Sequence, residues 1–264
     1  MRKVYVLPSL ITCLSMLCGL LAILNVLNVA EAPESETHQY VLSCWLILAA
    51  AVLDLLDGLV ARLTRTESLF GAQLDSLADV VAFGVAPAVL IYTRMANLEN
   101  RHLAEGTATF YAICGALRLA RFNVQKTKVE KKSFTGMPIP AAAGMVVSSF
   151  LFFQRIDPDW DKHFVLMVLP IMLLGLSFLM VSTVSYPSFK QLKLERRKQF
   201  NVLPVIFLLC ALGIFLKDYV EAVVFFGFVA YTAVGLLGEL TRPMWQKKRP
   251  PLPQPTTDPP NPTL

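Results

Sequence analysis

The chain has 264 residues, of which 55% are hydrophobic and 16% are charged, and its mean hydropathy is +0.55. Soluble domains carry about 25% charged residues, so the composition excludes a disordered chain and argues against a soluble one. The formal net charge is +5, but the basic residues lie in short segments between apolar runs, which argues against binding to nucleic acid.

Eight apolar runs follow one another along the chain. A helix of about 20 apolar residues crosses the hydrocarbon core of a bilayer and pairs its own backbone groups. We therefore predict an all-α membrane protein, a polytopic helical bundle with eight spans in total. The predicted spans cover residues 8–28, 39–61, 73–95, 106–124, 138–154, 164–186, 202–216 and 219–238.

The segments between the predicted spans alternate in charge. If the N-terminus is cytoplasmic, 19 of the 24 Lys and Arg residues fall in cytoplasmic segments and the other five in external ones. This distribution obeys the positive-inside rule. It supports the count of eight spans and predicts that both termini are cytoplasmic.

Three regions of the chain differ in composition. Residues 1–186 hold the first six spans, residues 187–248 hold a basic loop and two more spans, and residues 249–264 are rich in Pro. The last region cannot bury a core, so we predict that it is disordered. The five cysteines all lie in apolar runs and form no C-x-x-C pair, which favours small packing residues over a disulfide or thiolate metal site.

Four aspartates interrupt the second and third predicted spans. Asp54 and Asp57 lie near the end of one span, and Asp75 and Asp79 near the start of the next. A charged Asp costs about 2.5–3.5 kcal/mol at the bilayer centre, so an Asp in a span indicates function by default. Spacings of three and four place each pair on one helical face, and the short connection makes the two helices antiparallel neighbours. We therefore expect the four carboxylates to converge.

Converging carboxylates in a low dielectric need a cation, because like charges oppose their ionisation. Ligand sets made only of oxygen favour hard ions such as Mg²⁺, Ca²⁺ or Mn²⁺, and four Asp can hold two ions. Gly58, Ala61 and Gly71 remove side chains from the same surface, which favours close helix packing or room for a ligand. Arg62 can bind a phosphate or act as an ordinary positive flank.

The spacing of these residues resembles the signature of the CDP-alcohol phosphotransferase family. The segment reads Asp54-x2-Asp57-Gly58-x2-Ala61-Arg62-x8-Gly71-x3-Asp75-x3-Asp79. The resemblance implies a six-helix core within residues 1–186, followed by two additional spans. It also implies that Asp54, Asp57, Asp75 and Asp79 bind two Mg²⁺ or Mn²⁺ ions and that Asp79 is the general base. The same resemblance assigns binding of the CDP-lipid to Asp57, Gly58, Ala61, Arg62, Gly71 and Asp75.

Two further stretches resemble the integral-membrane phosphatidylserine synthase branch of that family. They are GALRLARFNV at residues 115–124 and FTGMPIPAAAG at residues 134–144. The branch implies transfer of a phosphatidyl group from CDP-diacylglycerol to the hydroxyl of L-serine, which gives phosphatidylserine and CMP. The sequence departs from the branch at Ser9 and Ser15, where the branch usually has Asn, and a hydroxyl offers fewer hydrogen-bonding groups than an amide.

The acceptor contacts are predicted near the end of the fourth span. A carboxylate suits a guanidinium fork, so Arg118 and Arg121 are candidates to bind serine or phosphate, with Asn123 beside them. The alternative is that these three residues cap a helix end. The family resemblance also implies a homodimer. We expect the protein in a bacterial inner membrane, with its active site on the cytoplasmic side.

Two rival functions remain open at this point. Within the family, the acceptor could be glycerol phosphate, inositol phosphate or another alcohol. Outside it, buried carboxylates also mark the pathways of cation-coupled transporters. Against a transporter, all four Asp lie in one predicted hairpin, and no acidic residue continues a path through the other spans.

Overall fold

The structure is a computed structural model, and it describes residues 6–30, 36–64, 68–96, 101–126, 134–156, 163–186 and 219–246. Seven long helical segments make up almost all of this described part. In chain order they are α1 (Val6–Leu27), α2 (Glu36–Thr64), the continuous run of α3 (Leu69–Asp79), η3 (Val80–Val85) and α4 (Ala86–Ala96), α5 (Arg101–Lys126), α6 (Ile139–Ile156), the run of η4 (Phe164–Val168) and α8 (Leu169–Val181), and α10 (Val220–Gln246). A short 3₁₀ turn, η1 (Asn28–Ala30), follows α1.

Six of these segments are long and apolar enough to cross a membrane, so the chain is a multi-pass membrane protein of helical class. The segment that does not qualify is α5, which carries charged residues such as Glu105, Arg118 and Arg121. Seven of the eight predicted spans coincide with described helical segments. The predicted span 202–216 and the predicted disordered tail, 249–264, lie outside the described residues.

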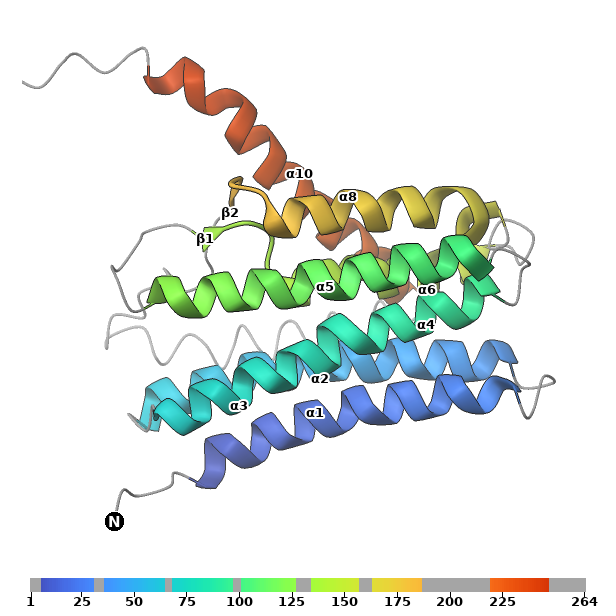
Figure 1. Ribbon diagram of the computed structural model, residues 1–264, viewed down its shortest axis with the longest axis horizontal. Helices are drawn as coiled ribbons and strands as arrows, with labels where there is room; N and C mark the ends of the chain where they lie inside the picture. The colour runs from blue at the N-terminus through green and yellow to red at the C-terminus, as the bar shows by residue number, and fades with distance from the viewer. Residues whose placement is uncertain are drawn as a thin grey trace, which may run out of the picture.

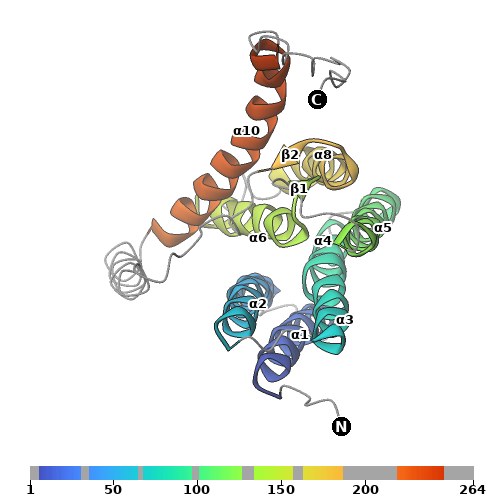
Figure 2. The same ribbon diagram turned by 90° about the vertical axis from the view of Figure 1, so that its left-hand side faces the viewer.

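The helices run roughly side by side, so their ends gather at two ends of the bundle (Figure 1). One end carries the beginning of α1, the end of α2, the beginning of α3 and the end of α5; we call it the carboxylate end. Viewed along the bundle, α10 packs beside α6 and then leans away from the other helices (Figure 2). Contacts between α1 and α2, α5 and α8, and α4 and α5 join neighbouring helices.

Small residues allow the helices to approach closely in the middle of the bundle. A Cβ added to Gly19 on α1 would lie 2.7 Å from the Cα of Ala82, and one added to Gly115 on α5 would lie 2.6 Å from the Cδ1 of Ile139. Large apolar side chains, among them Phe83 and Phe150, fill the core beyond these crossings. Close approach at Gly or Ala is the ordinary way in which membrane helices gain packing contacts.

A two-stranded antiparallel ladder closes the carboxylate end next to α6. Strand β1 (Phe134–Thr135) pairs with β2 (Ser185–Tyr186), which follows α8. Gly136 then turns the chain with φ of 86°, a conformation that favours glycine. Its N–H donates to the Val184 carbonyl at 2.8 Å. The FTGMPIP stretch is therefore a turn that fixes the start of α6 against the end of α8.

Candidate functional site

The hairpin of α2 and α3 positions the four aspartates. Asp57 lies about two helical turns before the end of α2 at Thr64, and Asp75 about two turns after the start of α3 at Leu69. Ser68 begins α3 as its N-cap, because its hydroxyl accepts a hydrogen bond from the Gly71 N–H at 3.0 Å. Antiparallel helices joined by so short a connection bring Asp57 and Asp75 to the same depth.

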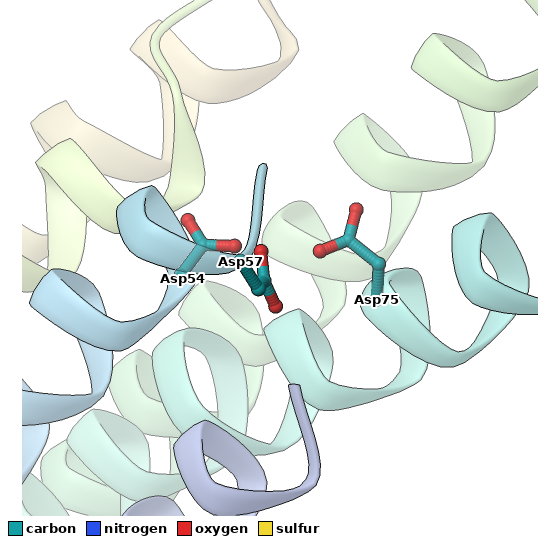
Figure 3. A group of neighbouring side chains, drawn as sticks. All are labelled: Asp54, Asp57 and Asp75. Atoms are coloured by element: carbon teal, nitrogen blue, oxygen red, sulfur yellow. The ribbon is translucent and has the colours of Figure 1, made fainter. Parts of the chain in front are cut away.

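Three carboxylates meet between the two helices. Asp54, Asp57 and Asp75 each offer an oxygen atom, and these atoms all lie within 4.8 Å of one another. Figure 3 shows the side chains of Asp54 and Asp57 on α2 and of Asp75 on α3 around one shared space. Asp57 is the most buried of the three, with 5% of its surface exposed. The predicted convergence is confirmed for this trio.

Thr12 on α1 hydrogen-bonds to Asp57, the buried member of the trio, and the sequence analysis assigned no role to Thr12. Its hydroxyl lies 2.6 Å from Oδ2 of Asp57 and 3.0 Å from the Pro8 carbonyl. One turn further, the Ser15 hydroxyl donates to the Ala50 carbonyl at 3.0 Å. The sequence does contain a signal for these contacts, because Thr12 and Ser15 are two hydroxyl residues three positions apart in an apolar run. Ser15 stands where the phosphatidylserine synthase branch usually has Asn, and its hydrogen bond joins α1 to α2.

Asp79 lies one turn beyond Asp75 and is not part of the trio. It interacts electrostatically with Asp54, Asp75 and Arg118. The π-helical segment η3 begins at the next residue, and such widened turns are frequent at functional sites. Asp79 therefore has members of the trio and a guanidinium within electrostatic reach.

The trio has the chemistry of a site for a hard divalent cation. Its donors are carboxylate oxygens, they come from two rigid helices, and a further hydrogen bond from Thr12 orients one of them. Mg²⁺ and related ions prefer oxygen ligands, and groups in the next layer orient such ligands. The described residues therefore fit a metal ion at Asp54, Asp57 and Asp75.

The small and basic residues of the motif lie on the same two helices as this site. A Cβ added to Gly58 would meet no atom within 4 Å, so the surface beside Asp57 is open. A Cβ added to Gly71 would lie 3.1 Å from the hydroxyl of its own capping residue, Ser68. Ala61 is half-buried and Arg62 is exposed, both at the end of α2. The surface beside Gly58 is thus uncovered by the described residues, whereas Gly71 serves the helix cap.

The three predicted acceptor residues have different surroundings. Arg118 is buried, with 8% of its surface exposed, and its Nε has no hydrogen-bond partner among the described residues. Arg121 donates from Nη1 to the Val181 carbonyl at 3.0 Å and to the Ser182 carbonyl at 3.4 Å. Asn123 donates to the Ser76 hydroxyl at 2.9 Å. Arg121 and Asn123 therefore join α5 to its neighbours, while Arg118 retains an unpaired donor close to Asp79.

The chain belongs to the CDP-alcohol phosphatidyltransferase family, which it matches over residues 5–181. The matched segment includes every helix from α1 to α8 and all the motif residues described above. Helix α10 lies outside it.

Three of the similar proteins share one name. The chain is 39% identical over 195 residues to the CDP-diacylglycerol–serine O-phosphatidyltransferase of Helicobacter pylori, which covers 73% of this chain and 76% of the relative. It is 42% identical over 188 residues to the protein of that name from Methanocaldococcus jannaschii, covering 71% and 77%. It is 38% identical over 185 residues to the protein of that name from Bacillus subtilis, covering 70% and 91%.

Proposed function

We propose that this membrane protein transfers the phosphatidyl group of CDP-diacylglycerol to L-serine, which yields phosphatidylserine and CMP. The observation that carries the proposal is the carboxylate trio of Asp54, Asp57 and Asp75 on one hairpin. Its sequence context supports the reaction, because relatives at about 40% identity over most of the chain bear the name of this enzyme.

The carboxylates have two roles in this proposal. Asp54, Asp57, Asp75 and Asp79 would hold two divalent ions, Mg²⁺ or Mn²⁺, and Asp79 would serve the second of them. A bound ion of this kind neutralises the diphosphate of the substrate and stabilises charge on the transferring group. Asp79 accepts the proton of the serine hydroxyl at its carboxylate. The serine oxygen bonds to the lipid-side phosphorus, and the bond from that phosphorus to the bridging oxygen breaks, so that CMP leaves.

The remaining motif residues bind and orient the two substrates. Asp57, Gly58, Ala61, Arg62, Gly71 and Asp75 surround the CDP moiety, and the open surface at Gly58 supports this assignment. We assign Arg118, Arg121 and Asn123 to the serine side of the site, although Arg121 and Asn123 also hydrogen-bond to neighbouring helices. Of these, Arg118 is the strongest candidate for the serine carboxylate, because its Nε is buried and unpaired among the described residues. Holding the serine hydroxyl in line with the phosphorus supplies much of the rate acceleration.

The placement in the membrane follows from the charge distribution and the resemblance. We place both termini and the carboxylate end on the cytoplasmic side of a bacterial inner membrane, because 19 of the 24 basic residues then lie inside. The lipid tails can enter from the bilayer while the cytidine stays in water. We also expect a homodimer, which chemical cross-linking in native membranes tests.

The decisive measurement is CMP release by the purified full chain supplied with CDP-diacylglycerol. We expect CMP and phosphatidylserine to appear only with both L-serine and Mg²⁺ or Mn²⁺, and EDTA to abolish both. The variant Asp57→Asn should keep its fold and lose both products. CMP released only with glycerol phosphate or inositol phosphate would contradict serine as the acceptor. No CMP with any acceptor from a folded protein would contradict the enzyme itself and favour transport.

A further inference from the structure

Tyr111 of α5 makes a buried hydrogen bond to the backbone of η3. Its hydroxyl donates to the Phe83 carbonyl at 3.1 Å, and both residues are fully buried. Helix α5 runs beside the continuous run of α3, η3 and α4 (Figure 1), and it contacts η3 and α4. The bond therefore joins two neighbouring helical segments in the interior of the bundle.

The Phe83 carbonyl needs a donor from outside its own helix. In a regular α-helix it would accept from the N–H four residues later, but that residue is Pro87, which has no N–H and whose ring presses on the same carbonyl. Here η3 is a widened turn, because the Ala86 N–H donates to the Val81 carbonyl, five residues back. Membrane helices accommodate a proline by such a π-turn and by donors from neighbouring helices. Tyr111 is the neighbouring donor in this chain.

Asp79 lies directly before the widened turn, between two points at which α5 is hydrogen-bonded to its segment. It is four residues before Phe83 and three residues after Ser76. The Ser76 hydroxyl accepts a hydrogen bond from Nδ2 of Asn123 on α5 at 2.9 Å. Helix α5 therefore holds the chain on both sides of Asp79, through Asn123 on one side and Tyr111 on the other.

We propose that Tyr111 positions Asp79 for catalysis, because it supplies the donor that Pro87 removes and so holds η3 in its widened form. The proposal rests on the proposed function, since it takes Asp79 as the general base. Each helical residue turns the chain by about 100°, so loss of the widened turn would rotate Asp79 relative to α4. Tyr111 is a positioning residue in this account and does not touch the substrate.

The physical reason is the precision that a catalytic base requires. A base must lie within hydrogen-bond reach of the proton it takes, and a misplacement of about 1 Å can cost about 100-fold in rate. A buried carbonyl that loses its donor is costly, so without the Tyr111 hydroxyl the chain around Phe83 would shift. Asp79 lies one turn away and would move with it, whereas the bond at Ser76 would keep the earlier part of α3 in place.

The first test is steady-state kinetics of the full chain with Tyr111→Phe, which removes the hydroxyl and keeps the ring. We expect kcat for CMP release to fall about ten- to hundredfold, while the KM values for L-serine and CDP-diacylglycerol stay unchanged. The control Tyr219→Phe makes the same change at a tyrosine that is 65% exposed, and it should match wild type. A wild-type kcat in Tyr111→Phe overturns the proposal.

A double-mutant cycle with Asp79→Asn separates positioning from general damage to the fold. If Tyr111 acts through Asp79, Tyr111→Phe should not lower the residual rate of Asp79→Asn any further, because no base is left to position. Radiolabelled CDP-diacylglycerol makes that residual rate measurable. Rate losses that multiply in the double variant would show that the hydroxyl acts by another route, and they would contradict the proposal.

Binding of Mn²⁺ gives a readout that does not depend on turnover. It is measured by electron paramagnetic resonance of the full chain with CDP-diacylglycerol present and serine absent. We expect the most tightly bound ion to have the same affinity in Tyr111→Phe as in wild type, because the trio of Asp54, Asp57 and Asp75 keeps its geometry. Loss of this ion would show that the whole site is disturbed, which contradicts a specific role toward Asp79.

The two levels of inference fail in different ways. If the wild-type chain binds no Mn²⁺ and releases no CMP with any acceptor, the proposed function fails. If the wild-type chain is active and Tyr111→Phe has the same kcat, only the positioning role of Tyr111 fails.

Discussion

The carboxylate end and the middle of the bundle use glycine in opposite ways. In the middle, Gly19 and Gly115 leave room for a neighbouring helix, because an added Cβ would lie 2.7 Å from Ala82 and 2.6 Å from Ile139. At the carboxylate end, Gly58 faces open space, with no atom within 4 Å of an added Cβ. The first kind of glycine serves packing, and the second leaves the surface beside Asp57 uncovered by the described residues. Stability and activity should therefore respond differently at the two places.

Outside the carboxylate trio, the largest effect is expected at Asp79. Asp79→Asn keeps the shape of the side chain but removes the base, and a general base contributes about 10²- to 10⁴-fold to the rate. CMP release should fall by that factor while the thermal midpoint holds or rises, because burial and the neighbouring carboxylates oppose a negative charge at this position. The control Glu105→Gln alters an exposed carboxylate on α5 and should leave the rate unchanged. Near-normal turnover in Asp79→Asn would assign the base elsewhere.

Thr12 is expected to have the next largest effect. Thr12→Val is nearly isosteric and removes the 2.6 Å hydrogen bond to Asp57. Losing a group that orients a metal ligand typically costs about 10- to 100-fold in metal affinity or activity. The Mn²⁺ concentration that gives half-maximal CMP release should rise, while Thr12→Ser should retain the wild-type value. An unchanged metal requirement in the valine variant would show that Asp57 needs no orientation from α1.

Most of the fold could be predicted from the sequence, because the length of the apolar runs, the charge of the segments between them and the spacing of the carboxylates are local signals. Seven predicted spans coincide with helical segments, and Asp57 and Asp75 meet because both lie about two turns from the same connection. Thr12 could not be found in this way, since its contact with Asp57 crosses 45 positions of sequence. The hydrogen bonds from Arg121 to the carbonyls of Val181 and Ser182 could not be predicted for the same reason, because they depend on how α5 packs against α8.

Gly58→Ala sharpens the comparison between the two kinds of glycine. A helical Gly-to-Ala change stabilises by about 0.5–1 kcal/mol where space allows, and space is open here. The added methyl group should nevertheless obstruct the CDP moiety and lower kcat/KM for CDP-diacylglycerol about tenfold or more. The two measurements are thermal unfolding in detergent and CMP release. Unchanged kcat/KM would mean that no substrate group occupies the space beside Asp57.

Gly19→Ala is the matched change in the middle of the bundle. The methyl group would press on the backbone of Ala82, and overpacking of this kind typically costs about 1–3 kcal/mol. We expect a lower thermal midpoint and, in the fraction that stays folded, little change in the KM for either substrate. A variant as stable as wild type would show that α1 can shift away from η3 without loss.

The smallest effect is expected at the end of the bundle far from the carboxylates, where Arg155 pairs with Glu221 at 3.0 Å. The Arg155 side chain is 49% exposed, and exposed ion pairs measured by double-mutant cycles give about 0.2–1 kcal/mol. A cycle with Arg155→Ala, Glu221→Ala and the double variant should therefore yield a small coupling in thermal unfolding and no change in the serine KM. A coupling well above that range would show that the lipid or a second subunit covers the pair. A change in the serine KM would mean that the packing of α10 against α6 at this end affects the proposed acceptor site.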